Sequence, residues 1–177
     1  MQTTIAIAPM LFTERLRLHG HGLRDFAESA GMWADPDVVR FIGGRPFTEE
    51  EVWTRLLRYV GHWAALGYGY WVIREAASGR FVGEVGFADF KRALDPPFDA
   101  PEIGWALAPW AQGRGYGLEA IQAVLAWGDG HFVTGARTVC MINPGNIASI
   151  RVAQRAGYRE YARTNYKGAA TVLYERC

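Results

Sequence analysis

The sequence predicts a mixed α/β domain, in which helices cover both faces of a mixed β-sheet. Half of its 177 residues are apolar and only 21% are charged, as is typical of a folded domain with a sizeable core. Strand-like and helix-like segments follow one another in the order β-α-α-β-β-β-α-β-α-β-β, which favours layered packing. No repeat, low-complexity segment or linker interrupts this order, so residues 1–177 are expected to form one domain.

The first elements are a strand and two helices. RLRLHG (15–20) alternates polar and apolar residues as a strand does, and a short helix is expected over 23–33. Thr48 and Glu51 form a capping pattern for a longer helix, which Gly67 ends. The apolar face of that helix is expected to contain Val52, Leu56, Tyr59, Val60 and Trp63.

The remaining elements alternate between strands and helices. Strands are expected over 69–75, 80–90, 102–109, 137–143, 158–163 and 170–176. Helices are expected over 118–132 and 147–156, and Gly157 closes the second of them. The stretch ALDPPFDAP (93–101) is rich in Pro and Asp and is expected to be a loop.

Charge and hydropathy exclude several classes of protein. The net charge is +1, from 19 basic and 18 acidic residues, which argues against a nucleic-acid surface. The N-terminus has no basic segment typical of a signal peptide, and no apolar run approaches the roughly 20 residues of a membrane span. A cytoplasmic protein that does not act at a membrane is therefore expected.

Cysteine and histidine usage argues against disulfides and metal sites. Cys140 lies in an apolar run and is expected to be buried, and Cys177 is the last residue. The histidines lack metal-ligand spacing, so no metal is expected. His19 and His21 are expected to be solvated at the end of a strand.

The stretch WAQGRGYGLEA (110–120) places three glycines within five residues before a helix. It lacks the Lys of a P-loop, and Leu118 stands where a dinucleotide fingerprint needs Gly or Ala. A plain strand-to-helix turn explains one glycine but not three. Backbone N–H groups that cradle an anion at the start of the helix, with Arg114 as a direct contact, explain the pattern better.

Gln112-x-x-Gly115-x-Gly117 after an apolar strand resembles the acetyl-CoA motif of the GNAT acetyltransferase family. EIGWALAPWAQGRGYGLEAIQAVLAW together with NPGNIASIRVAQRAGY resembles its RimJ/RimL-like branch, which modifies protein N-termini and other amines. The order of elements also matches, so the resemblance covers essentially the whole chain. It implies a mostly antiparallel sheet that splays apart at the strands that hold the cofactor.

The resemblance assigns the cofactor site. The pyrophosphate of acetyl-CoA would bind the loop formed by Gln112, Gly113, Arg114, Gly115, Tyr116, Gly117 and Leu118. The pantetheine arm would pair like a strand with the backbone of Trp105, Ala106 and Leu107. The matching Asn146 would also bind this arm.

Two residues are candidates for the chemistry. Glu102 resembles the general base of the histone-acetyltransferase branch, although it could instead be a strand-end carboxylate that orients the amine; Glu84 is the alternative base. Some members carry a glutamate where Met141 stands here. Ser149 is the candidate to protonate the thiolate or hold a water, because Ala153 replaces the tyrosine of many members; it could equally be an ordinary first-turn serine.

The resemblance also implies that the acceptor site lies between the first two helices. Trp33 and FIGGRPF (41–47) would line it, Gly43 and Gly44 would let it flex, and Arg40 or Arg45 could pair with an acceptor carboxylate. The loop 93–101 would add to selectivity.

Other functions stay open at this stage. The donor could be another acyl-CoA, the acceptor could be a protein N-terminus or a small amine, and the chain could bind coenzyme A as a sensor without turnover. The resemblance implies a homodimer, which the sequence itself does not establish.

Overall fold

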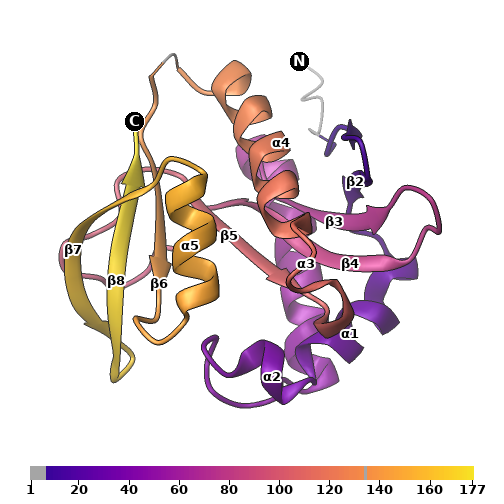
Figure 1. The fold of residues 1–177 in the computed structure, drawn as a ribbon, viewed down its shortest axis with the longest axis horizontal. Helices are drawn as coiled ribbons and strands as arrows, with labels where there is room; N and C mark the ends of the chain where they lie inside the picture. The colour runs from indigo at the N-terminus through magenta and orange to yellow at the C-terminus, as the bar shows by residue number, and fades with distance from the viewer. Residues whose placement is uncertain (1–6, 134) are drawn as a thin grey trace.

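The fold is a single eight-stranded sheet in the computed structural model, which describes residues 7–133 and 135–177 (Figure 1). The strands are β1 Leu11–Phe12, β2 Leu16–Gly20, β3 Tyr70–Glu75, β4 Phe81–Ala88, β5 Glu102–Leu107, β6 Thr138–Ile142, β7 Arg159–Tyr166 and β8 Ala169–Arg176. They lie in the order β1-β2-β3-β4-β5-β6-β8-β7, and every pair of neighbours is antiparallel except β5 and β6. The predicted mixed, mostly antiparallel sheet is confirmed.

Helices cover both faces of this sheet. They are α1 Phe26–Trp33, α2 Pro36–Val39, α3 Glu49–Leu66, α4 Tyr116–His131 and α5 Ile147–Arg155, with 3-10 turns at Leu23–Asp25 and Pro109–Ala111. In Figure 1, α4 and α5 lie in front of the sheet, and α1, α2 and α3 lie behind it. β1 and α2 were not predicted, because two and four residues are too short to show a period.

Local chemistry explains the bounds of α3. Thr48 and Glu51 form the predicted capping box, and Gly67 ends the helix with a φ of 75°. The prediction that Val60 belongs to the buried face is wrong, since its exposed fraction is 43%. The buried stripe runs through positions 52, 56, 59 and 63, and residue 60 lies past its edge.

Each face of the sheet has its own apolar cluster. The larger one packs α4 and α5 against the sheet around Trp71, Phe87 and Ile121, all fully buried. The smaller one packs α1 and α2 around Trp33 and includes Ala106 of β5. The two clusters fix β4 and β5 between two layers of helices.

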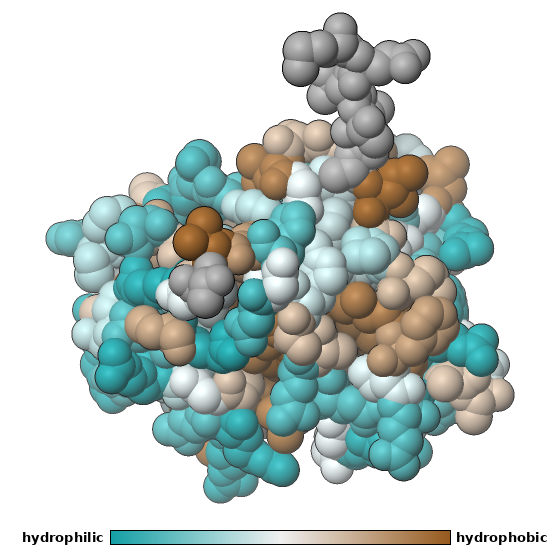
Figure 2. All heavy atoms as spheres, turned by 90° about the horizontal axis from the view of Figure 1, so that it is seen from above, coloured by the Kyte–Doolittle hydropathy of each residue, from teal (hydrophilic) through white to brown (hydrophobic). Residues whose placement is uncertain are grey.

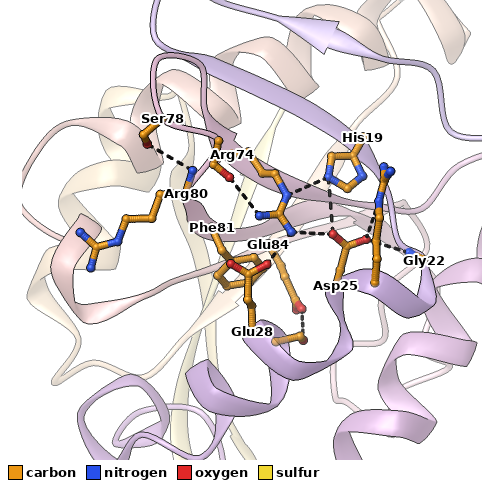
Figure 3. Close-up of polar contacts among 12 residues, drawn as sticks. His19, Gly22, Asp25, Glu28, Arg74, Ser78, Arg80, Phe81 and Glu84 are labelled. Carbon is orange, nitrogen blue, oxygen red and sulfur yellow. Dashed lines mark hydrogen bonds and ion pairs between the residues drawn. The ribbon is translucent and has the colours of Figure 1, made fainter.

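His19 and His21 are buried, which corrects the expectation that both are solvated. Arg74 donates from Nε to His19 Nε2 at 3.3 Å and from an Nη to Asp25 at 2.8 Å and to Glu28 at 2.6 Å (Figure 3). This network ties the start of α1 to β2 and β3. The partners of His19 come from distant segments, so its alternating strand pattern could not indicate burial.

His21 belongs to a second buried network, centred on Glu84 of β4. Ser29 and Trp33 of α1 donate hydrogen bonds to the Glu84 carboxylate, the latter at 3.0 Å. His21 Nε2 lies 3.4 Å from Oε1 of the same group. Burial alone would raise the pKa of Glu84, but His21, Ser29 and Arg55 outweigh it and hold the pKa below its usual range. The ionised carboxylate therefore pins α1 to the sheet.

The face shown in Figure 2 is mixed, with brown and tan groups lying among teal and pale ones. Among the described helices, none combines the length and apolar character needed to cross a bilayer. Cys140 is buried, as predicted, and Cys177 is exposed.

Replacing Glu84 by Gln should destabilise the fold by about 3 kcal/mol near neutral pH, because it removes one partner of a buried charge network. The pKa of Glu84 is lower in the folded protein than in the unfolded chain, where it is about 4.3. The ionised carboxylate therefore stabilises the fold fully above the unfolded pKa, and this contribution is lost as the pH falls through the folded pKa. The difference in free energy of unfolding between wild type and Glu84→Gln should therefore shrink below about pH 4. Urea unfolding from pH 3 to 8 measures it, and a difference that does not change with pH would contradict the assignment.

Candidate active site

The site is built around the divergence of β5 and β6. Glu102 and Val139 form the one register pair between these parallel strands in the described residues, supported by a 3.0 Å bond from the Val139 N–H to the Pro101 carbonyl. β6 pairs with β8 on its other edge over its whole length, and Figure 1 shows β5 running away from β6. One edge of β5 is therefore open from Ile103 onward.

Strand alternation identifies the groups that face this open edge. The Ala108 N–H bonds the Val82 carbonyl of β4, so alternate residues of β5 point toward β4 and the others toward the gap. Ala106 thus directs its N–H and C=O toward β4, whereas Trp105 and Leu107 direct theirs into the gap. The Leu107 carbonyl accepts a 3.1 Å bond from the Gln112 side chain. The Trp105 N–H and C=O and the Leu107 N–H remain available.

The glycine loop after β5 forms a row of free donors. Gly113 and Gly115 have φ values of 73° and 82°, a backbone conformation that favours glycine, and Gly115 is the N-cap of α4. Within the described residues, the N–H groups of 113–118 have no hydrogen-bond partner. They stand at the positive end of a 16-residue helix. This geometry favours an anion cradle over a plain turn.

Two arginines without a carboxylate partner lie beside the loop. The guanidinium carbon of Arg80 is 3.9 Å from the centre of the Trp110 ring, and that of Arg114 is 5.5 Å from it. Among the described residues, neither forms an ion pair. Their charge is therefore available to an anion bound at the loop.

A third arginine fixes the loop from behind. Arg15 donates to the Arg114 carbonyl at 3.0 Å and pairs with Glu119 of α4 at 2.7 Å. Glu119 also accepts from the Thr13 hydroxyl at 2.5 Å and from the Arg15 N–H at 2.9 Å. Burial alone would raise the pKa of Glu119, but the bonds from Thr13 and Arg15 outweigh it and lower the pKa. This clamp holds one loop carbonyl away from the free N–H groups.

The remaining predicted loop residues, 116–118, could contact a bound anion only through their backbone groups. The Tyr116 hydroxyl donates to Glu75 at 2.6 Å and points toward the β3–β4 turn. Gly117 is buried, and a Cβ there would lie 3.2 Å from the Leu107 side chain. Leu118 packs against the larger core cluster.

The start of α5 faces the same region. Asn146 accepts a 3.1 Å bond from the Ser149 N–H as the N-cap of the helix, so its amide nitrogen is left for another partner. Ser149 is half-buried in the first turn. Gly145 packs against Phe41, since a Cβ there would lie 3.0 Å from the Phe41 ring. The segment 41–47 thus meets the start of α5.

The candidate base Glu102 is buried and bound by Arg92. The Arg92 guanidinium donates to both carboxylate oxygens, at 2.6 and 2.9 Å, and also to the Tyr166 hydroxyl at 3.2 Å. Burial raises the pKa of Glu102 above its usual range, although the Arg92 charge opposes this. A carboxyl group with a raised pKa is a better proton acceptor than a solvated one.

Glu102 lies in a row along the α1–α3 face of β5. Glu84 stands opposite Ala106 on that face, and the Tyr70 hydroxyl covers Gly104, where an added Cβ would lie 2.1 Å from it. Burial raises the pKa of Tyr70 well above its usual value. Sequence analysis missed Tyr70 and Arg92, because neither stands in a motif.

A pocket of about 210 Å³ opens beside Glu102 and Arg92 and is lined partly by Phe98 and Ala100. The loop 93–101 therefore borders the candidate site, as expected. Arg40 and Arg45, considered above as possible partners of an acceptor carboxylate, are exposed and pair with Asp37 at 2.9 Å and Glu51 at 2.5 Å. In residues 7–133 and 135–177, no cluster of His, Cys, Asp or Glu could hold a metal ion.

Comparisons with known proteins report on the family and the fold of the chain. Residues 15–159 match the family model described as the acetyltransferase (GNAT) domain. The uncharacterized protein YkkB of Bacillus subtilis (strain 168) is 32% identical over 170 residues, covering 94% of each chain. A solved structure described as a GnaT-family acetyltransferase from Bordetella pertussis is 36% identical, with a TM-score of 0.85 over 96% of this chain and 99% of that one. RimL, a ribosomal L7/L12 alpha-N-protein acetyltransferase solved in complex with coenzyme A, is 16% identical, with a TM-score of 0.76 over 95% and 97% of the two chains, and shares the fold.

Replacing Glu119 by Gln should lower the melting temperature by a few degrees, because the clamp on Thr13 and Arg15 loses its charge. Glu160→Gln is the matched control: Glu160 also pairs with an arginine, at 2.7 Å, but on an exposed surface, where such pairs contribute little. Thermal unfolding of both variants measures the difference. Equal shifts in the two would show that the clamp does not fix the loop.

Proposed function

The chain belongs to the GNAT acetyltransferase family, and from this premise we propose that it transfers the acetyl group of acetyl-CoA to a primary amine. The observation that carries the proposal is the row of free N–H groups over 113–118, placed directly after the open edge of β5. The first feature suits a pyrophosphate, and the second suits an extended amide-bearing arm. Coenzyme A is bound in RimL, which shares this fold.

The residues present fit acetyl-CoA along its length. The N–H groups of Gly113, Gly115 and Gly117, aided by Arg114, would hold the pyrophosphate. The open groups of Trp105 and Leu107 would pair with the pantetheine amides, and the free amide nitrogen of Asn146 would donate to them. Acetyl-CoA supplies a thioester, which an amine can attack directly in a ternary complex.

The amine must lose a proton as it attacks. Glu102 is the proposed acceptor of that proton, directly or through a water. Its raised pKa favours this role, and its two oxygens keep lone pairs beyond those that Arg92 occupies. Arg92 orients the carboxylate.

Charge that develops on the thioester oxygen needs a donor nearby. A backbone N–H near Ala106 would serve; the alternation of β5 favours that of Trp105 or Leu107, whichever the pantetheine arm leaves free, because Ala106 bonds β4. Ser149, in the first turn of α5, would protonate the departing thiolate or hold a water that does so.

The branch of the family and the class of acceptor are proposed from the same sequence resemblance. We propose membership of the RimJ/RimL-like branch, with a protein N-terminus or a small-molecule amine as the acceptor. The two free cysteines suit a reducing cytoplasm.

Arg114→Glu should weaken acetyl-CoA binding about tenfold or more, because it removes a charge-assisted contact and adds a negative charge beside the pyrophosphate. Calorimetric titration with acetyl-CoA measures the dissociation constant. Arg155→Glu reverses the same charge at an exposed position at the far end of α5 and should leave the constant unchanged. A wild type that does not bind acetyl-CoA would overturn the proposed function.

Glu102→Gln should lower kcat about 100-fold while acetyl-CoA binding persists, because Gln keeps an oxygen for Arg92 but does not accept the proton. The rate of thiol release from acetyl-CoA with an amine acceptor measures kcat, and the melting temperature reports whether the site stays folded. If kcat falls less than about threefold, Glu102 is not the base, although the transferase assignment would stand.

A further inference from the structure

Two arginines of α3 lie beside the candidate active site without a carboxylate partner. Arg55 and Arg58 are three residues apart and share one face of the helix. The described residues place no carboxylate within ion-pair distance of either. Arg17, Arg151 and Arg155 also lack an ion pair among the described residues, but Arg55 and Arg58 are the two held against aromatic rings beside the candidate base.

Aromatic rings hold both guanidinium groups in place. Arg55 lies 4.1 Å from the centre of the Trp33 ring and 4.9 Å from that of Phe47. Arg58 lies 4.5 Å from the centre of the Phe90 ring. Such contacts fix the planes of the guanidinium groups and leave their N–H edges free to donate.

Arg55 has an unsatisfied donor in a buried place. One of its terminal nitrogens donates to the Tyr59 hydroxyl at 3.0 Å, but its Nε is buried with no hydrogen-bond partner. A buried donor without an acceptor is costly, and a ligand that supplies the acceptor recovers that cost.

Intervening aromatic side chains connect the two arginines to the surroundings of Glu102. Tyr59, which accepts from Arg55, stacks on Tyr70 with ring centres 4.2 Å apart, and the Tyr70 hydroxyl covers Gly104 of β5. Phe90, beside Arg58, also contacts Arg92, the partner of Glu102, at 4.8 Å. Both arginines therefore border the α1–α3 face of β5, where the candidate base lies.

Every carboxylate in this neighbourhood already has hydrogen-bond or ion-pair partners, and Arg55 interacts with Glu84 only at longer range. Glu84 is held by His21, Ser29 and Trp33, and Glu102 is held by Arg92. Asp89 pairs with Lys91 at 2.7 Å. Burial lowers the pKa of the Arg58 guanidinium, and the charges of Arg55 and Arg92 lower it further, as expected where cations outnumber available anions.

We propose that the acceptor amine of this transferase also carries a carboxylate, which Arg55 and Arg58 bind. This rests on the proposed function and adds a substrate class to it. A carboxylate matches the fork of donors on a guanidinium, whereas a polyamine would be repelled by the two unpaired charges. The carboxylate can be that of a free amino acid or of an acidic residue next to a peptide N-terminus.

The test compares matched acceptors that differ only in charge. The twenty L-amino acids are assayed beside their C-terminal amides, short peptides with Glu at position two beside the same peptides with Gln, and spermidine as a polycation. The rate of thiol release from acetyl-CoA gives kcat/KM for each. The best acceptor should be a carboxylate-bearing amine, at least about tenfold better than its neutral counterpart, and the amino-acid and peptide arms distinguish the two sources.

Arg58→Gln should reduce that ratio about tenfold through KM, Arg58→Lys should keep part of it, and Arg155→Gln, at an exposed position, should leave it intact. Acetyl-CoA titration of each variant checks that the cofactor site is unaffected. The proposal is overturned if neutral acceptors or spermidine react best, if Arg58→Gln keeps the ratio, or if acetyl-CoA binds and no carboxylate-bearing amine reacts. Loss of acetyl-CoA binding by the wild type would instead overturn the proposed function.

Discussion

The separation of β5 from β6 is the constraint on which the site depends. The backbone N–H and C=O groups of a strand inside a sheet normally form hydrogen bonds with both neighbouring strands. β5 pairs with β6 at one position only, so the rest of that edge has no strand partner. β5 is held in place despite this open edge, because its other edge pairs with β4 over six residues and helices pack on both faces. The glycine loop lies next to this open edge, since it joins the end of β5 at Leu107 to the start of α4 at Tyr116.

The arginines near the site have different partners from most other arginines of the molecule. Most arginines of the described chain are neutralised by carboxylates, such as Arg74 by Asp25 and Glu28 (Figure 3). Those left without a carboxylate near the site rest on aromatic rings instead, Arg80 and Arg114 at the glycine loop and Arg55 and Arg58 on α3. An aromatic ring orients a guanidinium without using its N–H edge, which a carboxylate would occupy. The first pair lies beside the proposed cofactor site and the second beside the proposed acceptor site.

The sequence predicted the parts of the site that are local in the chain. The glycine spacing predicted the free N–H groups, and the Asn146–Ser149 pair predicted the cap of α5, because the partners lie within a few residues of one another. The partners of Glu102 and His19 could not be predicted. Arg92 lies ten residues from Glu102 across an irregular loop, and Arg74 is 55 residues from His19. Such pairs depend on how strands align, which periodicity within one segment does not determine.

The surroundings of the two buried carboxylates favour Glu102 over Glu84 as the base. Glu84 accepts hydrogen bonds from Ser29 and Trp33, lies beside His21 and has a lowered pKa, so it stays ionised and its oxygens are occupied in holding α1. Glu102 has one partner, a raised pKa and a pocket beside it through which an amine or a water can approach. A base must release the proton that it accepts, and a group held ionised by a rigid network is poorly suited to that exchange. The two carboxylates therefore divide between stability and chemistry according to the direction of their pKa shifts and to the pocket that opens beside Glu102.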